Sequence, residues 1–317
     1  MPEQTAVIDA SKPYNQPHRS GRLRSSGRFW LAVFRAYPSF AVGYGIIGIV
    51  VTVAVLAPWL SPYDPVRADP NAYLQPPGPL HWLGTDNTGM DILTRIIYAP
   101  RTDLVIAIIG TLISSMVGAP LGAIVGYYEG KGGWRRALSI LVMRTADVLQ
   151  AFPVFVFAIA LVAVFGQGIS SIVTAIAFVN IPIYVRLMRS QVLSIRNMRY
   201  VEAAFVAGAS DAAIVWRHII PNSIASVLAQ LSINVGWSVL LTAGLSFVGA
   251  GVVAPTPEWG SMIASGFQSV MTGQWWPSIF PGIALGLTVF GFALIGASIE
   301  VLSDPAQRRL LVANIRA

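Results

Sequence analysis

The sequence predicts an all-α protein that crosses a membrane with six helices. Of its 317 residues, 55% are hydrophobic and only 11% are charged, which is too apolar for an ordinary soluble domain. A helix needs about 20 mainly apolar residues to cross the hydrocarbon core. Six stretches approach or meet this requirement, and none shows the alternation of a membrane β-strand. They are residues 40–60, 104–127, 139–165, 169–185, 223–252 and 278–299.

Basic residues predict the orientation of these spans. Lys and Arg are frequent in both tails and in the connections that follow the second and fourth spans, whereas residues 256–276 contain neither. Cytoplasmic segments carry such an excess of Lys and Arg, so we expect both termini in the cytoplasm (N-in/C-in). These membrane flanks also explain the net charge of +7, and no nucleic-acid partner is expected.

Three regions are expected along the chain. Residues 1–28 mix Pro, Ser, Gly and Arg without apolar periodicity, which predicts a mobile cytoplasmic tail. Residues 29–102 combine an uncleaved N-terminal anchor helix with a proline-rich external loop. In that loop, residues 88–98 can form a helix that Pro100 ends just before the second span. Residues 103–317 hold the other five spans, and small residues spaced four apart on the second span predict close helix packing.

The third span contains two features with both a structural and a functional interpretation. Arg144 and Asp147 lie three residues apart near its cytoplasmic end. Charges inside a membrane are often functional, yet an i, i+3 pair near the interface can neutralise itself and reach the headgroups. Pro153 frees a carbonyl and can kink the span, which suits gating but is common in membrane helices.

The connection between the fourth and fifth spans, residues 200–222, is the strongest functional candidate. Residues 201–206 favour a short helix, and Gly208 then allows a backbone angle that Ala resists. Glu202 lies near the start of that helix, where the helix dipole favours a carboxylate. We expect Glu202 to contact a partner or to brace the loop, and a solvated surface glutamate is the alternative.

The same connection predicts a second short helix after the glycine. Ser210 or Asp211 can cap it, and it would run from residue 212 to about His218. Arg217 and His218 would then be cations near a helix end, where compensation of the dipole is a sufficient explanation. Pro221 suits the first turn of the next span. The sequence therefore predicts two short helices that lie across the cytoplasmic face, with an ordinary amphipathic loop as the alternative.

Several chemistries are absent from the sequence. It has no G-x-x-x-x-G-K-[ST], H-E-x-x-H or G-x-S-x-G motif. It has no cysteine, which excludes disulfides and thiolate metal sites. Its three histidines are far apart: His18, His81 and His218. We therefore expect no catalytic residue, bound cofactor or metal on this chain.

Several segments together resemble the C-type permease subunits of dipeptide/oligopeptide ABC importers. The connection with Glu202-Ala203-Ala204 and Gly208 resembles the EAA loop of ABC import permeases in general, and the GTD and PTPEWGS segments indicate the narrower group. The resembling segments are LSPYDP at 60–65, HWLGTDNTGMDILTRIIYAPRTDL at 81–104, MRTADVLQAFP at 143–153, RSQVLSIRNMRYVEAAFVAGASDAAIVWRHIIPN at 189–222, LSFVGAGVVAPTPEWGSMIASG at 245–266 and WWPSIFPG at 275–282.

The resemblance implies a fold, a mechanism and a set of partners. The fold is that of a type I ABC importer permease in the bacterial inner membrane. A homologous B-type permease would complete the pore, an extracytoplasmic binding protein would deliver a peptide or similar small solute, and two ATPase subunits would bind ATP and magnesium. Those ATPases would dock on the EAA loop. Its implied coupling residues are Glu202, Ala203, Ala204, Gly208, Ala209, Ser210, Asp211, Arg217, His218 and Pro221.

Three sites depart from the family pattern. Met90 stands where an arginine is usual, and Ala99-Pro100 replaces a small-residue pair. His218 stands where the general motif has an aliphatic residue. A stand-alone secondary carrier or channel is the alternative function. Such carriers often contain inverted repeats, no repeat is evident here, and the EAA loop would then have no partner.

Overall fold

Long helices that run side by side form most of the described chain, which comprises residue 30 and residues 33–303 of this computed structural model. The described residues contain no β-strand, so the predicted all-α class is confirmed. Five helices in the described part of the chain are long and apolar enough to cross a membrane by themselves. They are α2 (Pro38–Leu60), α3 (Ile92–Tyr128), α6 (Ile169–Ile195), α9 (Ile220–Phe247) and α11 (Trp276–Ser303). The expected tail, residues 1–28, lies outside the described residues.

The predicted third span, 139–165, is divided into two helices. α4 (Trp134–Ala151) and α5 (Val154–Phe165) meet at an angle of 95°, and together they make the sixth candidate span. Proline disfavours the helical conformation in the residue before it, and Phe152 is indeed extended, with φ −79° and ψ 139°. Pro153 therefore ends one helix and caps the next, which is a complete break rather than a kink within one helix.

The predicted boundary at Pro100 is wrong, because α3 runs without interruption through Pro100 and Pro120. The helix begins at Ile92, where the Asp91 side chain accepts a hydrogen bond from the Thr94 amide at 2.8 Å. Pro100 lacks one amide donor, but it and Ala99 are buried among neighbouring helices. Helix packing therefore stabilises this turn despite the missing hydrogen bond.

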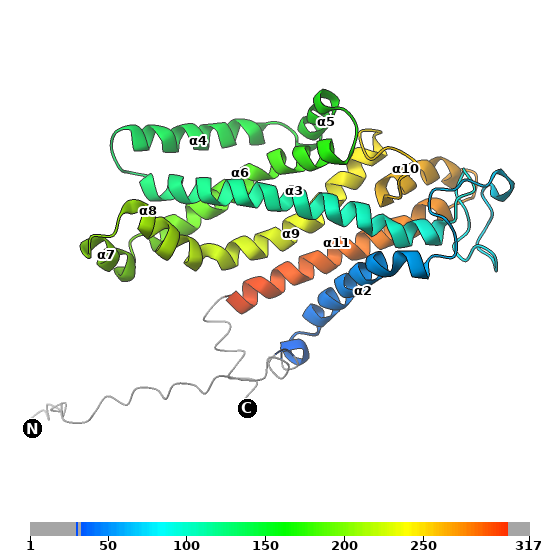
Figure 1. Cartoon of the computed structure of the whole chain (residues 1–317), viewed down its shortest axis with the longest axis horizontal. Coiled ribbons are helices and arrows are strands. Elements are labelled where there is room, and N and C mark those ends of the chain that lie inside the picture. Colours follow the sequence, from blue (N-terminus) through cyan, green and yellow to red (C-terminus); the bar gives the residue numbers. More distant parts are fainter. Residues whose placement is uncertain (1–29, 31–32, 304–317) are drawn as a thin grey trace, which may run out of the picture.

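The described chain has two distinct ends (Figure 1). The short helices α7 (Arg199–Val206) and α8 (Asp211–Ile214) lie at one end, and the connection between α2 and α3 lies at the other, with α10 (Trp259–Val270) toward it. α2 begins and α11 ends on the α7 side. The basic connections also lie on that side, which fits the predicted orientation.

Glycines allow α3 and α6 to pack closely, as the four-residue spacing predicted. A Cβ atom added to Gly118, Gly122 or Gly126 would lie 2.7, 2.3 or 2.9 Å from a backbone oxygen of α6. Distances below 3.0 Å require the helices to separate. The close packing of α3 and α6 therefore forms a rigid support for the loop that contains α7.

We expect Gly122→Ala to destabilise the protein by about 1–3 kcal/mol, because the added methyl group would overpack the interface between α3 and α6. Thermal unfolding in detergent, followed as loss of the monodisperse species, measures the effect. Gly286→Ala is the matched control, since nothing lies within 4 Å of a Cβ at that helical position. Equal melting temperatures for the two variants would contradict the packing argument.

Candidate coupling site

α7 forms a short helix that ends at a glycine, as the sequence predicted. Its C-terminal turn is closed by hydrogen bonds from the amides of Gly208 and Ala209 to the carbonyls of Phe205 and Ala204, each at 3.0 Å. Gly208 has φ +81°, a left-handed conformation that side chains with a Cβ resist. The glycine therefore sets the direction in which the chain leaves α7.

We expect Gly208→Val to impair solute uptake, because a β-branched residue would be strained at this backbone angle by about 1–2 kcal/mol. Uptake by the complex in proteoliposomes is the measurement. No atom lies within 4 Å of a Cβ built at Gly208, so the effect would come from the backbone alone. Gly132→Val, in a loop with equal space but no positive φ, is the control. Unchanged uptake by Gly208→Val would contradict the need for this turn.

The second short helix is not a separate element, which corrects the prediction. Ser210 caps α8, since its hydroxyl accepts a hydrogen bond from the Ala213 amide at 3.2 Å. α8 then continues through the π-helical turn η2 (Val215–Ile219) into α9. Pro221 lies in the first turn of α9, as predicted. The π turn changes the hydrogen-bond register just before this proline, so the chain remains helical.

Arg217 and His218 consequently lie within a continuous helix and not at its end. Compensation of a helix dipole therefore does not explain them. The Arg217 side chain is exposed, and His218 is half-buried. Single π turns inside α-helices occur frequently at functional sites.

Asp211 anchors this loop to the end of α3 and the start of α4. The Tyr127 hydroxyl donates to its Oδ1 at 2.7 Å, and Lys131 Nζ donates to the same oxygen at 3.2 Å. Arg135 donates to Oδ2 at 2.8 Å. Hydrogen bonds to a charged group contribute about 1.5–3 kcal/mol each. One carboxylate therefore joins α8 to α3 and α4, which are both distant from it in sequence.

A second set of contacts locks α3 to α6 beside this anchor. Arg189 forms a two-pronged pair with Glu129, with both N–O distances 2.7 Å. These hydrogen bonds lower the pKa of Glu129. Arg196 donates to the carbonyls of Gly126 at 3.0 Å and Glu129 at 2.6 Å. The ends of α3 and α6 that lie beside the loop are thus fixed to each other.

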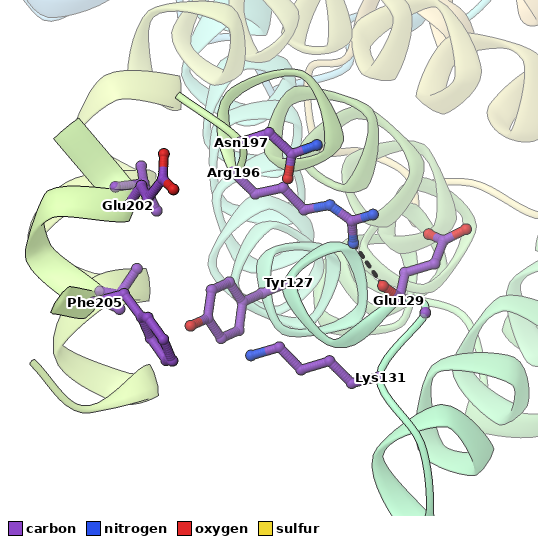
Figure 2. Close-up of a pocket in the computed structure, with 10 residues that line it drawn as sticks. Tyr127, Glu129, Lys131, Arg196, Asn197, Glu202 and Phe205 are labelled. Carbon is purple, nitrogen blue, oxygen red and sulfur yellow. Dashed lines mark hydrogen bonds between the residues drawn. The ribbon is translucent and has the colours of Figure 1, made fainter. Parts of the chain in front are cut away.

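A hollow of about 570 Å³ separates α7 from these anchoring residues. Figure 2 shows Glu202 and Phe205 on the α7 side and Tyr127, Lys131 and Arg196 opposite them. Within the described residues, the Glu202 side chain has no hydrogen-bond or ion-pair partner. Phe205 is 64% exposed. The α7 face therefore offers a carboxylate and apolar side chains to another molecule.

The other predicted residues divide between structural and exposed positions. Ala204 and Ala209 are partly buried against the apolar cluster below the loop, and Ala203 is exposed. The structure does not bring Arg144, Asp147 and Pro153 to this site. Arg144 lies 3.7 Å from Asp147, which makes a shorter bond of 2.7 Å with Arg186 of α6. The i, i+3 pair is therefore the weaker part of a three-residue cluster.

The residues that support the loop are not apparent from the sequence. Lys131 and Arg135 indicate only the orientation there, and Tyr127 marks the end of a span. Their basic and aromatic character was visible, but their distance from Asp211 along the chain hid the contact.

Taken together, the helices define a multi-span membrane protein with an exposed loop at one end. Two family models match the chain. Residues 118–309 match the binding-protein-dependent transport system inner membrane component, and residues 27–77 match the N-terminal transmembrane domain of oligopeptide transport permease C.

Relatives match over most of their length. The dipeptide transport system permease protein DppC of Alkalihalophilus pseudofirmus is 37% identical over 84% of this chain and 86% of its own. The glutathione transport system permease protein GsiD of Pectobacterium atrosepticum is 37% identical over 87% and 90%. The probable D,D-dipeptide transport system permease protein DdpC of Escherichia coli is 34% identical over 92% and 94%.

The fold is also found in a solved structure. A chain of the inward-facing MetNI methionine ABC transporter superposes with a TM-score of 0.52 at 16% identity, covering 70% of this chain and 97% of that one. The chain belongs to the family of binding-protein-dependent transport system inner membrane components. It is a multi-pass permease subunit of an ABC importer, and a stand-alone carrier or channel is not favoured.

Proposed function

We propose that this chain is the C-type permease of an ATP-driven importer of di- or oligopeptides or a similar small solute in the bacterial inner membrane. It forms half of the pore with a homologous B-type permease. Two ATPase subunits hold ATP and magnesium, and an extracytoplasmic binding protein delivers the solute. The peptide assignment is supported by the names of the relatives, which include dipeptide and glutathione permeases.

The observation that carries the coupling proposal is the contrast between the two parts of the loop. α8 is fixed through Asp211 to both α3 and α4, whereas α7 presents Phe205 and Val206, which are 64% and 80% exposed. An anchored α8 next to an exposed apolar surface on α7 suits the transmission of movement from a docked partner. Nucleotide binding to the ATPases would then bias two states of the helix bundle.

The regions of the chain have separate roles in this proposal. The EAA loop, residues 200–222, is the coupling element of a permease core formed by residues 103–317. Residues 29–102 supply the anchor helix and external loop, and residues 1–28 a cytoplasmic tail.

Purification of the chain from its native membrane in mild detergent tests this function. Mass spectrometry should identify two P-loop ATPases and a second six-span permease in the same complex. Recovery of a folded chain without an ATPase, under conditions that preserve other ABC complexes from the same membrane, would contradict the proposal.

A further inference from the structure

α4 carries exposed charges although it forms the first part of a candidate membrane span. It contains 18 residues, about 27 Å of helix, and it buries only Ser139 and Ala146 against the rest of the chain. The side chains of Arg144 and Asp147 are 79% and 44% exposed. Charged side chains within a membrane span often mark a water-lined path for a solute or an ion.

Arg136 and Arg144 lie on one flank of α4, whereas Arg135 lies on the opposite flank from Arg144 and pairs with Asp211. Arg136, Ile140 and Arg144 are spaced by four and share a face. Leu141, which lies about 140° around the helix from Arg136, is apolar and 64% exposed. The same helix thus has one side suited to water and another suited to lipid or an apolar neighbour.

A hollow of about 630 Å³ lies along the charged flank, between α4, the end of α3 and α6. We call it the α4–α6 hollow. Its size is in the range of small-molecule sites. Its lining includes Arg136, Arg144, Asp147, Glu129 and Arg189.

The acids of the α4–α6 hollow already have partners, but two of its cations are available. Glu129 is held by Arg189 at 2.7 Å, and Asp147 by Arg186 at 2.7 Å. Arg144 makes only the long contact of 3.7 Å with Asp147, and Arg136 has no hydrogen-bond or ion-pair partner among the described residues. The positive charges exceed the negative ones, so the hollow should attract an anion.

We propose that the α4–α6 hollow is part of the solute pathway and that Arg136 and Arg144 bind the carboxylate of the passing solute. This proposal rests on the proposed import of a peptide-like solute. Arginine suits carboxylate recognition because its planar group can donate two parallel hydrogen bonds. Asp147 is paired with Arg186 through Oδ1, but it is 44% exposed, and within the described residues its Oδ2 has only the 3.7 Å contact with Arg144. This oxygen can therefore accept from the solute's ammonium group. A hollow with both signs of charge fits a zwitterionic peptide better than it fits phosphatidylglycerol, whose headgroup carries no cation.

Cysteine labelling of the assembled complex tests the proposal, since the chain has no natural cysteine. Ile140→Cys places a thiol between the two arginines, and Leu141→Cys places one on the apolar flank as the matched control. Both parent side chains are well exposed, at 50% and 64%. The complex is held in phosphatidylcholine nanodiscs and treated with an anionic sulfonatoethyl or a cationic trimethylammonium methanethiosulfonate.

We expect Ile140→Cys to react at least threefold faster with the anionic reagent than with the cationic one. The added pair Arg136→Gln and Arg144→Gln should remove that preference, and Leu141→Cys should react slowly with both. No reaction at Ile140→Cys, or equal rates with the two reagents, would overturn the aqueous, anion-attracting hollow. Loss of reaction when phosphatidylglycerol is added would show that lipid occupies it, which would also overturn the proposal.

Protection by a peptide tests recognition of the carboxylate. Dialanine should slow the anionic reaction at Ile140→Cys more than dialanine amide, which lacks the carboxylate. Equal protection by the two compounds would contradict carboxylate binding. Co-purification of the ATPases is measured on the same samples. Its failure would reject the importer, whereas failure of labelling with the ATPases present would reject only the α4–α6 hollow.

Discussion

Replacing Asp211 with asparagine should reduce solute-stimulated ATP hydrolysis and uptake by at least tenfold. The change keeps the shape of the side chain but removes the charge that Lys131 and Arg135 contact at 3.2 and 2.8 Å. Loss of about 1.4 kcal/mol from this anchor would correspond to a tenfold change in the population of the correctly placed loop. Hydrolysis and uptake by the purified complex in proteoliposomes measure the effect.

The control for this variant is Asp64→Asn. Asp64 lies in the connection between α2 and α3, where its side chain accepts a hydrogen bond from the Val66 amide at 2.9 Å. It should leave activity unchanged. Membrane insertion and yield of Asp211→Asn should equal those of the parent, because the spans do not depend on the anchor. Full activity of Asp211→Asn would show that the ion-pair cluster does not position the loop.

Reversing the charge at Glu202 should release the ATPases from the permease. The carboxylate faces a hollow that contains Lys131 and Arg196, so Glu202→Lys would place a third cation there and repel any basic group of a partner. We expect the amount of co-purified ATPase to fall about tenfold, in line with the cost of breaking a close charged contact. Quantitative mass spectrometry of the purified complex is the measurement.

Glu202→Gln provides the matched comparison, because it removes the charge without reversing it. It should cause a smaller loss than Glu202→Lys. Insertion of the helices should be normal in both variants. Normal solute-stimulated hydrolysis by Glu202→Lys would indicate that Glu202 is a solvated surface residue.

The sequence was sufficient to predict five of the six spans as continuous helices, and the turn in the loop, because these depend on local properties. Apolar length gives the spans, and Gly208 is needed for a positive φ. Two features depended on tertiary packing and were not predicted. α3 continues through Pro100 because the turn is buried, and α8 continues into α9 through a π turn.

The candidate site was predictable only in part for a related reason. The capping role of Ser210 follows from its place in the chain, since a cap acts on the next few amides. The partners of Asp211 lie 84 and 76 residues away, in Tyr127 and Arg135. No local pattern identifies such a pair, so the cluster became visible only in the folded chain.

Cross-linking from α7 tests the central claim most directly. A photoreactive p-benzoylphenylalanine at Phe205 should form an adduct with an ATPase subunit in the assembled complex. The same residue at Trp82, which is 74% exposed in the connection between α2 and α3, should form none with the ATPases. Absence of an ATPase adduct at Phe205, while the ATPases remain bound, would contradict docking on α7.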